Sequence, residues 1–106
     1  MPKPSKYRNV AIKIDDIRFA SKKEAARYQQ LKLLERAGNI SGLELQKSFT
    51  LVPKQGGLRA VTYRADFCYQ YNGHQVVEDV KGILTPVYVI KRALMFERHG
   101  IRICEI

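Results

Sequence analysis

Two aspartates, Asp66 and Asp79, are the residues of this chain best placed to do metal chemistry. Each lies in a run that reads as a β-strand, and the spacing predicts that the two carboxylates face each other. Hard cations such as Mg²⁺ take oxygen ligands and often use one or two carboxylates, so a divalent cation would explain the pair. The alternative is a solvated sheet face on which Arg64 and Lys81 neutralise two incidental aspartates.

The expected pairing follows from the turn Asn72-Gly73, which is typical of a two-residue β-hairpin loop. With this turn Tyr71 pairs with His74, and the same register places Asp66 directly opposite Asp79. Side chains that face each other in this way have Cβ atoms roughly 4.5–5.5 Å apart, and like charges there destabilise the sheet. The hairpin is predicted over 60–71 and 76–82. Two acids that face each other in it would destabilise it unless something offsets their repulsion.

A third acid, Glu24, lies near the start of a predicted helix over 21–37. Ser21-Lys22-Lys23-Glu24 fits a capping box, in which Glu24 would bond back to the Ser21 N–H. Helical spacing also places Glu24 on the side that carries Tyr28 and Leu31, which is expected to face the sheet. From spacing alone Glu24 is either a helix cap or a ligand presented to the aspartates.

The remaining elements complete an α/β pattern. We expect a hairpin over 10–19 that turns at Asp15-Asp16, a strand over 43–52, a helix over 86–98 capped by Thr85, and a last strand over 101–106. The second helix is predicted to bury Val87, Ile90, Leu94 and an edge formed by Met95 and Phe96. Three antiparallel strands followed by a helix and a returning strand give a layered sheet flanked by helices.

Length and composition favour one domain over 1–106, and its basic charge suits a negatively charged partner. The chain has 106 residues and a net charge of +9, which favours a polyanionic partner, nucleic acid first. Residues 1–9 are expected to form a flexible basic arm. No apolar run suits a membrane span or a signal peptide, so we expect a cytoplasmic protein. Cys68 and Cys104 have no zinc-ligand spacing and are expected to be small core residues.

Against this background the chain resembles the PD-(D/E)XK nuclease superfamily, which includes restriction endonucleases and archaeal-type Holliday junction resolvases. The likeness rests on the αβββαβ order, an acid on the first helix, an aspartate on the second core strand and the D-x-K of Asp79-Val80-Lys81. The stretches 19–25, 45–46, 63–67 and 78–86 also look like small phage-encoded proteins of unknown function. The resemblance implies a restriction-endonuclease-like core with a mixed central sheet, preceded here by the N-terminal hairpin.

The resemblance assigns roles to individual residues. Glu24, Asp66, Asp79 and Lys81 match its four catalytic positions, although Ala65 stands where the motif has proline. Glu78 is excluded because the register puts it on the opposite sheet face, across from Phe67. The metal, Mg²⁺ or Mn²⁺, is then held by Asp66, Asp79, the Val80 carbonyl and Glu24, the last directly or through water. Gln46 matches a glutamine found in some members.

The implied activity is Mg²⁺-dependent hydrolysis of DNA phosphodiester bonds, with Lys81 orienting the attacking water. We expect a structure-selective endonuclease that acts as a homodimer on branched or double-stranded DNA, as a Holliday junction resolvase does. The predicted phosphate contacts are Lys22, Lys23, Arg27, Arg64, Lys91 and Arg92. A nicking or end-processing phage endonuclease is the nearest alternative, and a non-catalytic nucleic-acid-binding protein with a structural acid cluster is the other. In a phage or prophage setting the compartment would be the bacterial cytoplasm.

Overall fold

The computed structural model describes residues 12–80 and 84–106, which form an α/β fold with two helices and two sheets. The elements in chain order are β1 (Ile12–Ile14), β2 (Ile17–Phe19), α1 (Lys22–Arg36), β3 (Ser41–Val52), β4 (Val61–Tyr71), β5 (His74–Asp79), α2 (Pro86–His99) and β6 (Cys104–Glu105). This is the predicted order, although the last strand is shorter than expected. Residues 1–11, which include the expected basic arm, and residues 81–83 lie outside the described part.

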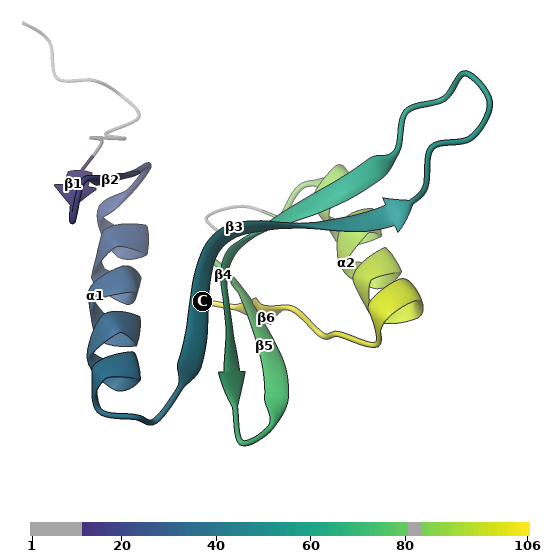
Figure 1. Ribbon diagram of the computed structural model, residues 1–106. Coiled ribbons are helices and arrows are strands. Elements are labelled where there is room, and N and C mark those ends of the chain that lie inside the picture. Colours follow the sequence, from purple (N-terminus) through teal and green to yellow (C-terminus); the bar gives the residue numbers. More distant parts are fainter. Residues whose placement is uncertain (1–11, 81–83) are drawn as a thin grey trace, which may run out of the picture.

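The main sheet has the order β3-β4-β5-β6 and is mixed. Strands β3, β4 and β5 are antiparallel neighbours, and β6 returns after α2 to lie parallel to β5. Strands β3 and β4 are long and strongly curved, so α1 stands beside one half of them and α2 lies against the other half (Figure 1). The short β1–β2 hairpin sits at the start of α1 as a separate sheet.

The hairpin of β4 and β5 has the predicted register. Tyr71 pairs with His74, and Phe67 pairs with Glu78 at the other end of the described ladder. Asn72 and Gly73 have φ angles of 49° and 77°, the left-handed conformation that a type I′ turn requires at both central residues. The ladder ends at the Phe67–Glu78 pair, directly beside Asp66 and Asp79 in the two strands.

Helix α1 begins as its sequence predicts. The Ser21 hydroxyl accepts the Glu24 backbone N–H at 3.1 Å, which satisfies one of the free amides of the first turn. The helix buries Ala25, Tyr28 and Leu31 against the sheet. The β1–β2 hairpin closes over it through the Phe19 and Tyr28 rings, whose centroids are 4.9 Å apart.

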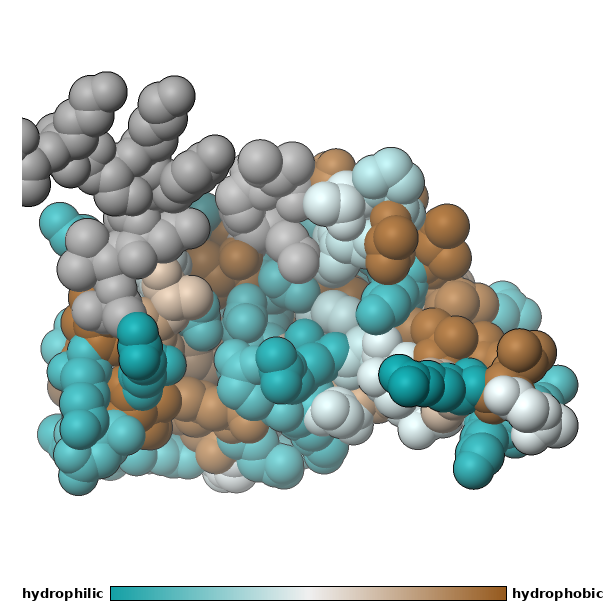
Figure 2. Space-filling model, turned by 90° about the horizontal axis from the view of Figure 1, so that it is seen from above, coloured by the Kyte–Doolittle hydropathy of each residue, from teal (hydrophilic) through white to brown (hydrophobic). Residues whose placement is uncertain are grey.

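The predicted buried side of α2 is right for Met95, which is buried, and for Leu94, which packs against the core, and wrong for its other residues. The helix buries Tyr88 and Met95, whereas Val87 and Ile90 are 62% and 61% exposed and Phe96 is 49% exposed. Apolar residues lie on nearly every side of this helix, so periodicity alone could not identify the packed one. Figure 2 shows hydrophobic side chains on the surface at the end of the molecule that holds α2 and the β3–β4 arm.

Two hydrophobic clusters lie on the two sides of the curved sheet. Leu45 and Phe67 pack in the cluster under α1, while Phe49, Tyr63 and Ala65 pack in the cluster under α2. Residues two apart should share one face, so both strands change face between these positions. On β3 the change falls at Gln46, whose φ of 56° is left-handed, an uncommon conformation for a residue other than glycine.

The cysteine prediction is half right. Cys68 is buried in the cluster under α2, but Cys104 is exposed on the edge strand β6. An edge strand has one open side, so its alternate positions do not all reach a core. Neither described helix is long and apolar enough to cross a membrane.

Candidate metal and phosphate site

Asp66 lies at the change of face in β4, and its carboxylate is held by the end of β5. Its Oδ2 atom accepts the Val80 backbone N–H at 2.7 Å. Its Oδ1 atom lies 3.5 Å from the Gln46 side-chain nitrogen, at the long limit of a hydrogen bond. The side chain is half-buried. Asp66 therefore bridges all three antiparallel strands at the point where β3 and β4 twist.

Asp79 ends β5 and is only 3% exposed. The Tyr63 hydroxyl donates to its Oδ2 atom at 2.5 Å. Its backbone carbonyl accepts the Ile106 N–H at 2.9 Å, so β6 fixes the main chain at the same place. Asp79 is thus held from both the side chain and the backbone, which limits how far its carboxylate can move.

The electrostatics of the site reveal mutual repulsion among three acids. Burial raises the pKa of the Asp66 carboxyl, the Val80 N–H opposes this rise, and the nearby Asp79 carboxylate adds to it. Burial also raises the pKa of Glu24, and the charges of Asp66 and Asp79 raise it further. Like charges that disfavour one another in this way are common where a protein binds a cation or handles a proton.

The structure describes one half of the predicted capping box, in which Ser21 accepts the Glu24 backbone N–H, and the ligand role of the Glu24 carboxylate stays a prediction. This half-buried carboxylate lies close enough to Asp66 and Asp79 to feel both charges. Within residues 12–80 and 84–106, however, no three His, Cys, Asp or Glu side chains come close enough to hold a metal ion alone. The two aspartates are the core of the site, and Glu24 is at its edge.

The sequence did not point to Tyr63 as a residue of the site, and it pointed to Gln46 only through a match to a glutamine found in some members of the superfamily. Burial and Asp79 raise the pKa of Tyr63, so its hydroxyl stays protonated and donates to the aspartate. Tyr63 and Asp79 are in different strands, and only the exact twist of β4 turns an apparent core tyrosine toward the acid. The left-handed Gln46 is also a product of that twist, since its backbone conformation brings its amide toward Asp66.

Lys81 lies outside the described residues, so its predicted role stays a prediction. Val80, the residue before it, is described and half-buried. Its N–H donates to Asp66, which places Val80 beside the aspartates, and the predicted role of its carbonyl as a metal ligand stays a prediction. Glu78 lies on the α1 side, packed opposite Phe67 as predicted.

The predicted phosphate contacts fall into two groups. Lys22, Lys23 and Arg64 are exposed, and Lys91 is half-buried. Arg92 instead donates to the Glu105 carboxylate at 2.7 Å. Arg27 forms a two-point ion pair with Glu78, with nitrogen-to-oxygen distances of 2.7 and 2.6 Å. Its guanidinium is thus committed within the protein, which makes the three exposed cations the better candidates for DNA.

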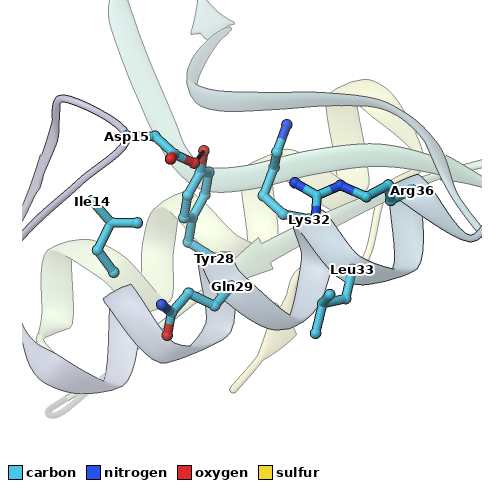
Figure 3. A pocket seen from close by; sticks show the side chains of 7 residues that line it. All are labelled: Ile14, Asp15, Tyr28, Gln29, Lys32, Leu33 and Arg36. Atoms are coloured by element: carbon cyan, nitrogen blue, oxygen red, sulfur yellow. Dashed lines mark hydrogen bonds between the residues drawn. The ribbon is translucent and has the colours of Figure 1, made fainter.

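A separate hollow lies between the β1–β2 turn and α1, away from the aspartates (Figure 3). Two of its charged residues already have partners, because Asp15 accepts the Tyr28 hydroxyl at 2.8 Å and Lys32 pairs at 3.4 Å with Glu35, which lies outside the hollow. Figure 3 shows Tyr28 reaching up to Asp15, with Lys32 and Arg36 further along the helix. The carboxylate cluster, which holds unfavourable charge, is the stronger functional candidate.

Comparison with known proteins gives a family but no activity. Residues 4–103 match the family described as "Protein of unknown function (DUF1064)". No curated protein and no solved structure matches the chain. The match covers both described helices, nearly the whole main sheet and all the acids of the site. The chain therefore belongs to the DUF1064 family.

Proposed function

We propose that this protein is a metal-dependent DNA endonuclease with a restriction-endonuclease-like core. The carrying observation is the convergence of Glu24, Asp66 and Asp79, whose charges raise the pKa of the first two carboxyls. They come from α1, β4 and β5, the elements that carry the acids in the PD-(D/E)XK superfamily that the sequence resembles. The mixed sheet with α1 and α2 on its sides is compatible with that core.

The donor set fits a hard divalent cation. Asp66 and Asp79 supply carboxylate oxygens, and the repulsion among the acids is of the kind that a cation relieves. Because no third acid is close enough for direct binding in the described part, we assign Glu24 to a water-mediated contact. The Val80 carbonyl is the further oxygen that the resemblance implies, and the bond from the Val80 N–H to Asp66 keeps this residue beside the aspartates. Mg²⁺ usually keeps several waters, so a site of two carboxylates suits it.

The chain's own residues would position the reaction. When bound, Mg²⁺ or Mn²⁺ would supply an activated water and offset charge on the scissile phosphate. Tyr63 fixes one oxygen of Asp79 and so orients the other part of the carboxylate. Lys81, assigned from the sequence, would orient the attacking water and stabilise the phosphorane-like charge as a compact cation.

The proposed substrate is branched or double-stranded DNA, held by backbone contacts. Lys22 and Lys23 lie at the start of α1, directly before Glu24, and Arg64 lies two residues before Asp66. All three are exposed and adjoin the acids, so they suit contacts to phosphates on either side of a scissile bond. Such contacts position DNA without reading its sequence, which favours selection by structure.

A cleavage assay tests this proposal directly. Purified protein is incubated with four-way, flapped, nicked and linear DNA in Mg²⁺ or Mn²⁺, with Asp66→Ala as the matched control. We expect metal-dependent cleavage that is fastest on the four-way junction and absent in the control. Preference for nicked or flapped DNA would point to a nicking or end-processing enzyme. Tight DNA binding with no cleavage of any substrate would contradict the enzyme and favour a binding protein.

The resemblance also implies a homodimer, and that remains part of the proposal. Two sites on one junction would let both strands be cut in a single encounter. Sedimentation velocity at working concentration tests it, with a single species of twice the 12.2 kDa chain mass as the expected result. A monomer at all concentrations, alone and with DNA, would contradict it.

A further inference from the structure

Arg27 and Glu78 form a buried ion pair beside the acid site, though neither belongs to it. Arg27 Nε donates to Glu78 Oε1 at 2.7 Å, and its Nη2 donates to Oε2 at 2.6 Å. The Tyr69 hydroxyl also donates to Oε2, so both carboxylate oxygens are occupied. Glu78 is 1% exposed and the Arg27 side chain 23%. This is a fully satisfied pair with a fixed two-point geometry.

Stability alone explains such a pair poorly. Moving two charges out of water costs as much as their attraction returns, and well-packed apolar residues often hold a fold equally well. The pair lies beside Phe67 and Tyr69 in the apolar cluster under α1. A leucine and a methionine would suit that setting. What they could not supply is a fixed distance and direction, which the planar guanidinium fork gives to a carboxylate.

The location of the pair shows what this geometry fixes. Arg27 is three residues after Glu24, on the same part of α1, and Glu78 is the residue directly before Asp79. The ion pair therefore joins the helix that carries Glu24 to the strand that carries Asp79. A second side-chain hydrogen bond joins α1 to the main sheet. In it the Leu43 N–H donates to the Glu35 carboxylate at 3.0 Å, near the far end of the helix. Of these two contacts between α1 and the main sheet in the described part of the chain, the Arg27–Glu78 pair is the one at the site end.

We infer that Arg27 and Glu78 are positioning residues that set the separation between the Glu24 carboxylate and the Asp66–Asp79 pair. The inference rests on the proposed metal-dependent function. A supporting shell of this kind matters because a site must hold its groups within about 0.5 Å of the working geometry. Tyr69 completes the arrangement by fixing the carboxylate from the sheet side. The pair acts through Glu24 and touches neither metal nor substrate.

The test replaces the pair while keeping the packing. The double variant Arg27→Met/Glu78→Leu is compared with wild type, with Glu35→Gln as a control that loosens α1 at its other end. Mn²⁺ affinity is measured by calorimetry, in the normal chain and in a Glu24→Gln background. We expect the double variant to fold and to bind Mn²⁺ about tenfold more weakly. In the Glu24→Gln background the same replacement should have no further effect, and Glu35→Gln should not weaken Mn²⁺ binding.

A metal-free measurement separates this role from the function on which it rests. Hydrogen exchange of the α1 amides should speed up in the first half of the helix of the double variant and stay unchanged in the second half. Arg27→Lys, which keeps the charge but loses the fork, is used in the same way if the double variant fails to fold. An equal loss of affinity with and without Glu24, or unchanged exchange, would overturn the positioning role alone. Absence of Mn²⁺ binding in the wild type would overturn the proposed function together with it.

Discussion

The two faces of β5 treat neighbouring acids in opposite ways. On the α1 face, Glu78 is buried and matched by Arg27 and Tyr69, so its charge is fully compensated. On the other face, Asp79 is equally buried but lies against Asp66, whose pKa rises partly because of it. The ion pair on the α1 face joins two elements, whereas the repulsion between close acids on the other face is of the kind that a cation relieves. The comparison distinguishes an acid committed to an ion pair from the acid at the next position, which we propose to be functional.

The largest effect is expected from replacing Asp79, on the face of β5 that we propose to be functional. Asp79→Asn should lower the rate of metal-dependent DNA cleavage roughly 10³-fold, because it removes a carboxylate that we propose to hold the metal. The fold should survive, since the asparagine oxygen can still accept the Tyr63 hydroxyl. Single-turnover cleavage of a four-way junction measures the loss, and circular dichroism checks the fold. A variant that cleaves at the wild-type rate would remove Asp79 from the site.

The next largest effect is expected from breaking the Arg27–Glu78 ion pair on the α1 face of β5. Arg27→Ala should lower the free energy of unfolding by about 3 kcal/mol, because it leaves the buried Glu78 without its ion-pair partner. Lys23→Ala, an exposed change on the same helix, should stay within about 0.5 kcal/mol of wild type. Urea unfolding of both variants in metal-free buffer measures the difference. Similar stabilities for the two would mean that Glu78 needs no partner.

A smaller effect is expected from replacing Asp66, and it is a gain in the free energy of unfolding rather than a loss. Its raised pKa means that the folded chain holds this proton more tightly than the unfolded chain does. The contribution of Asp66 to the stability of the metal-free protein should therefore be fully present below the ordinary carboxyl pKa, about 4. It should be lost as the pH rises through the raised pKa of the folded protein. Asp66→Asn removes this penalty and should stabilise the metal-free protein at pH 7 by about 1 kcal/mol.

The measurement for Asp66→Asn is urea unfolding at pH 4 and pH 7, with Asp16→Asn as a control. Asp16 is an exposed turn residue paired with Lys13 at 3.7 Å, so its replacement should change little at either pH. The gain from Asp66→Asn should shrink at the lower pH. A loss of stability at pH 7 would show that the carboxylate is structural, as Glu78 is.

The smallest effect concerns Gln46. Gly tolerates its left-handed φ of 56° better, so Gln46→Gly should stabilise the chain by about 0.5 kcal/mol while removing the amide beside Asp66. Cleavage should slow about threefold, as expected for the loss of one weak contact to a metal-holding acid. Thermal unfolding and cleavage are measured on the same preparation. A destabilised variant with normal activity would contradict this account of Gln46.

Local signals in the sequence predicted much of this structure. Asn72-Gly73 set the hairpin register and so the closeness of Asp66 to Asp79, and Ser21 set the start of α1. Both depend on residues close together in the chain. The buried side of α2 could not be chosen, because that helix is apolar on most of its surface.

Long-range contacts were beyond sequence reasoning. Arg27 reads as one more exposed cation until Glu78, 51 residues away, is seen to hold it. Tyr63 reads as a core residue until the twist of β4 turns it to Asp79. The closeness of Glu24 to the aspartates likewise depends on how α1 packs, which spacing left open between a cap and a ligand. The parts of the site that could be predicted are those within one hairpin.

Crystals soaked in Mn²⁺ give the most direct test of the central claim that the acid face of β5 is a metal site. The account predicts an anomalous peak within coordination distance of the Asp66 and Asp79 carboxylates, with none beside Glu78. The same soak of Asp66→Asn crystals should lose that peak. A wild-type crystal saturated with Mn²⁺ that shows no peak between the two aspartates would contradict the account.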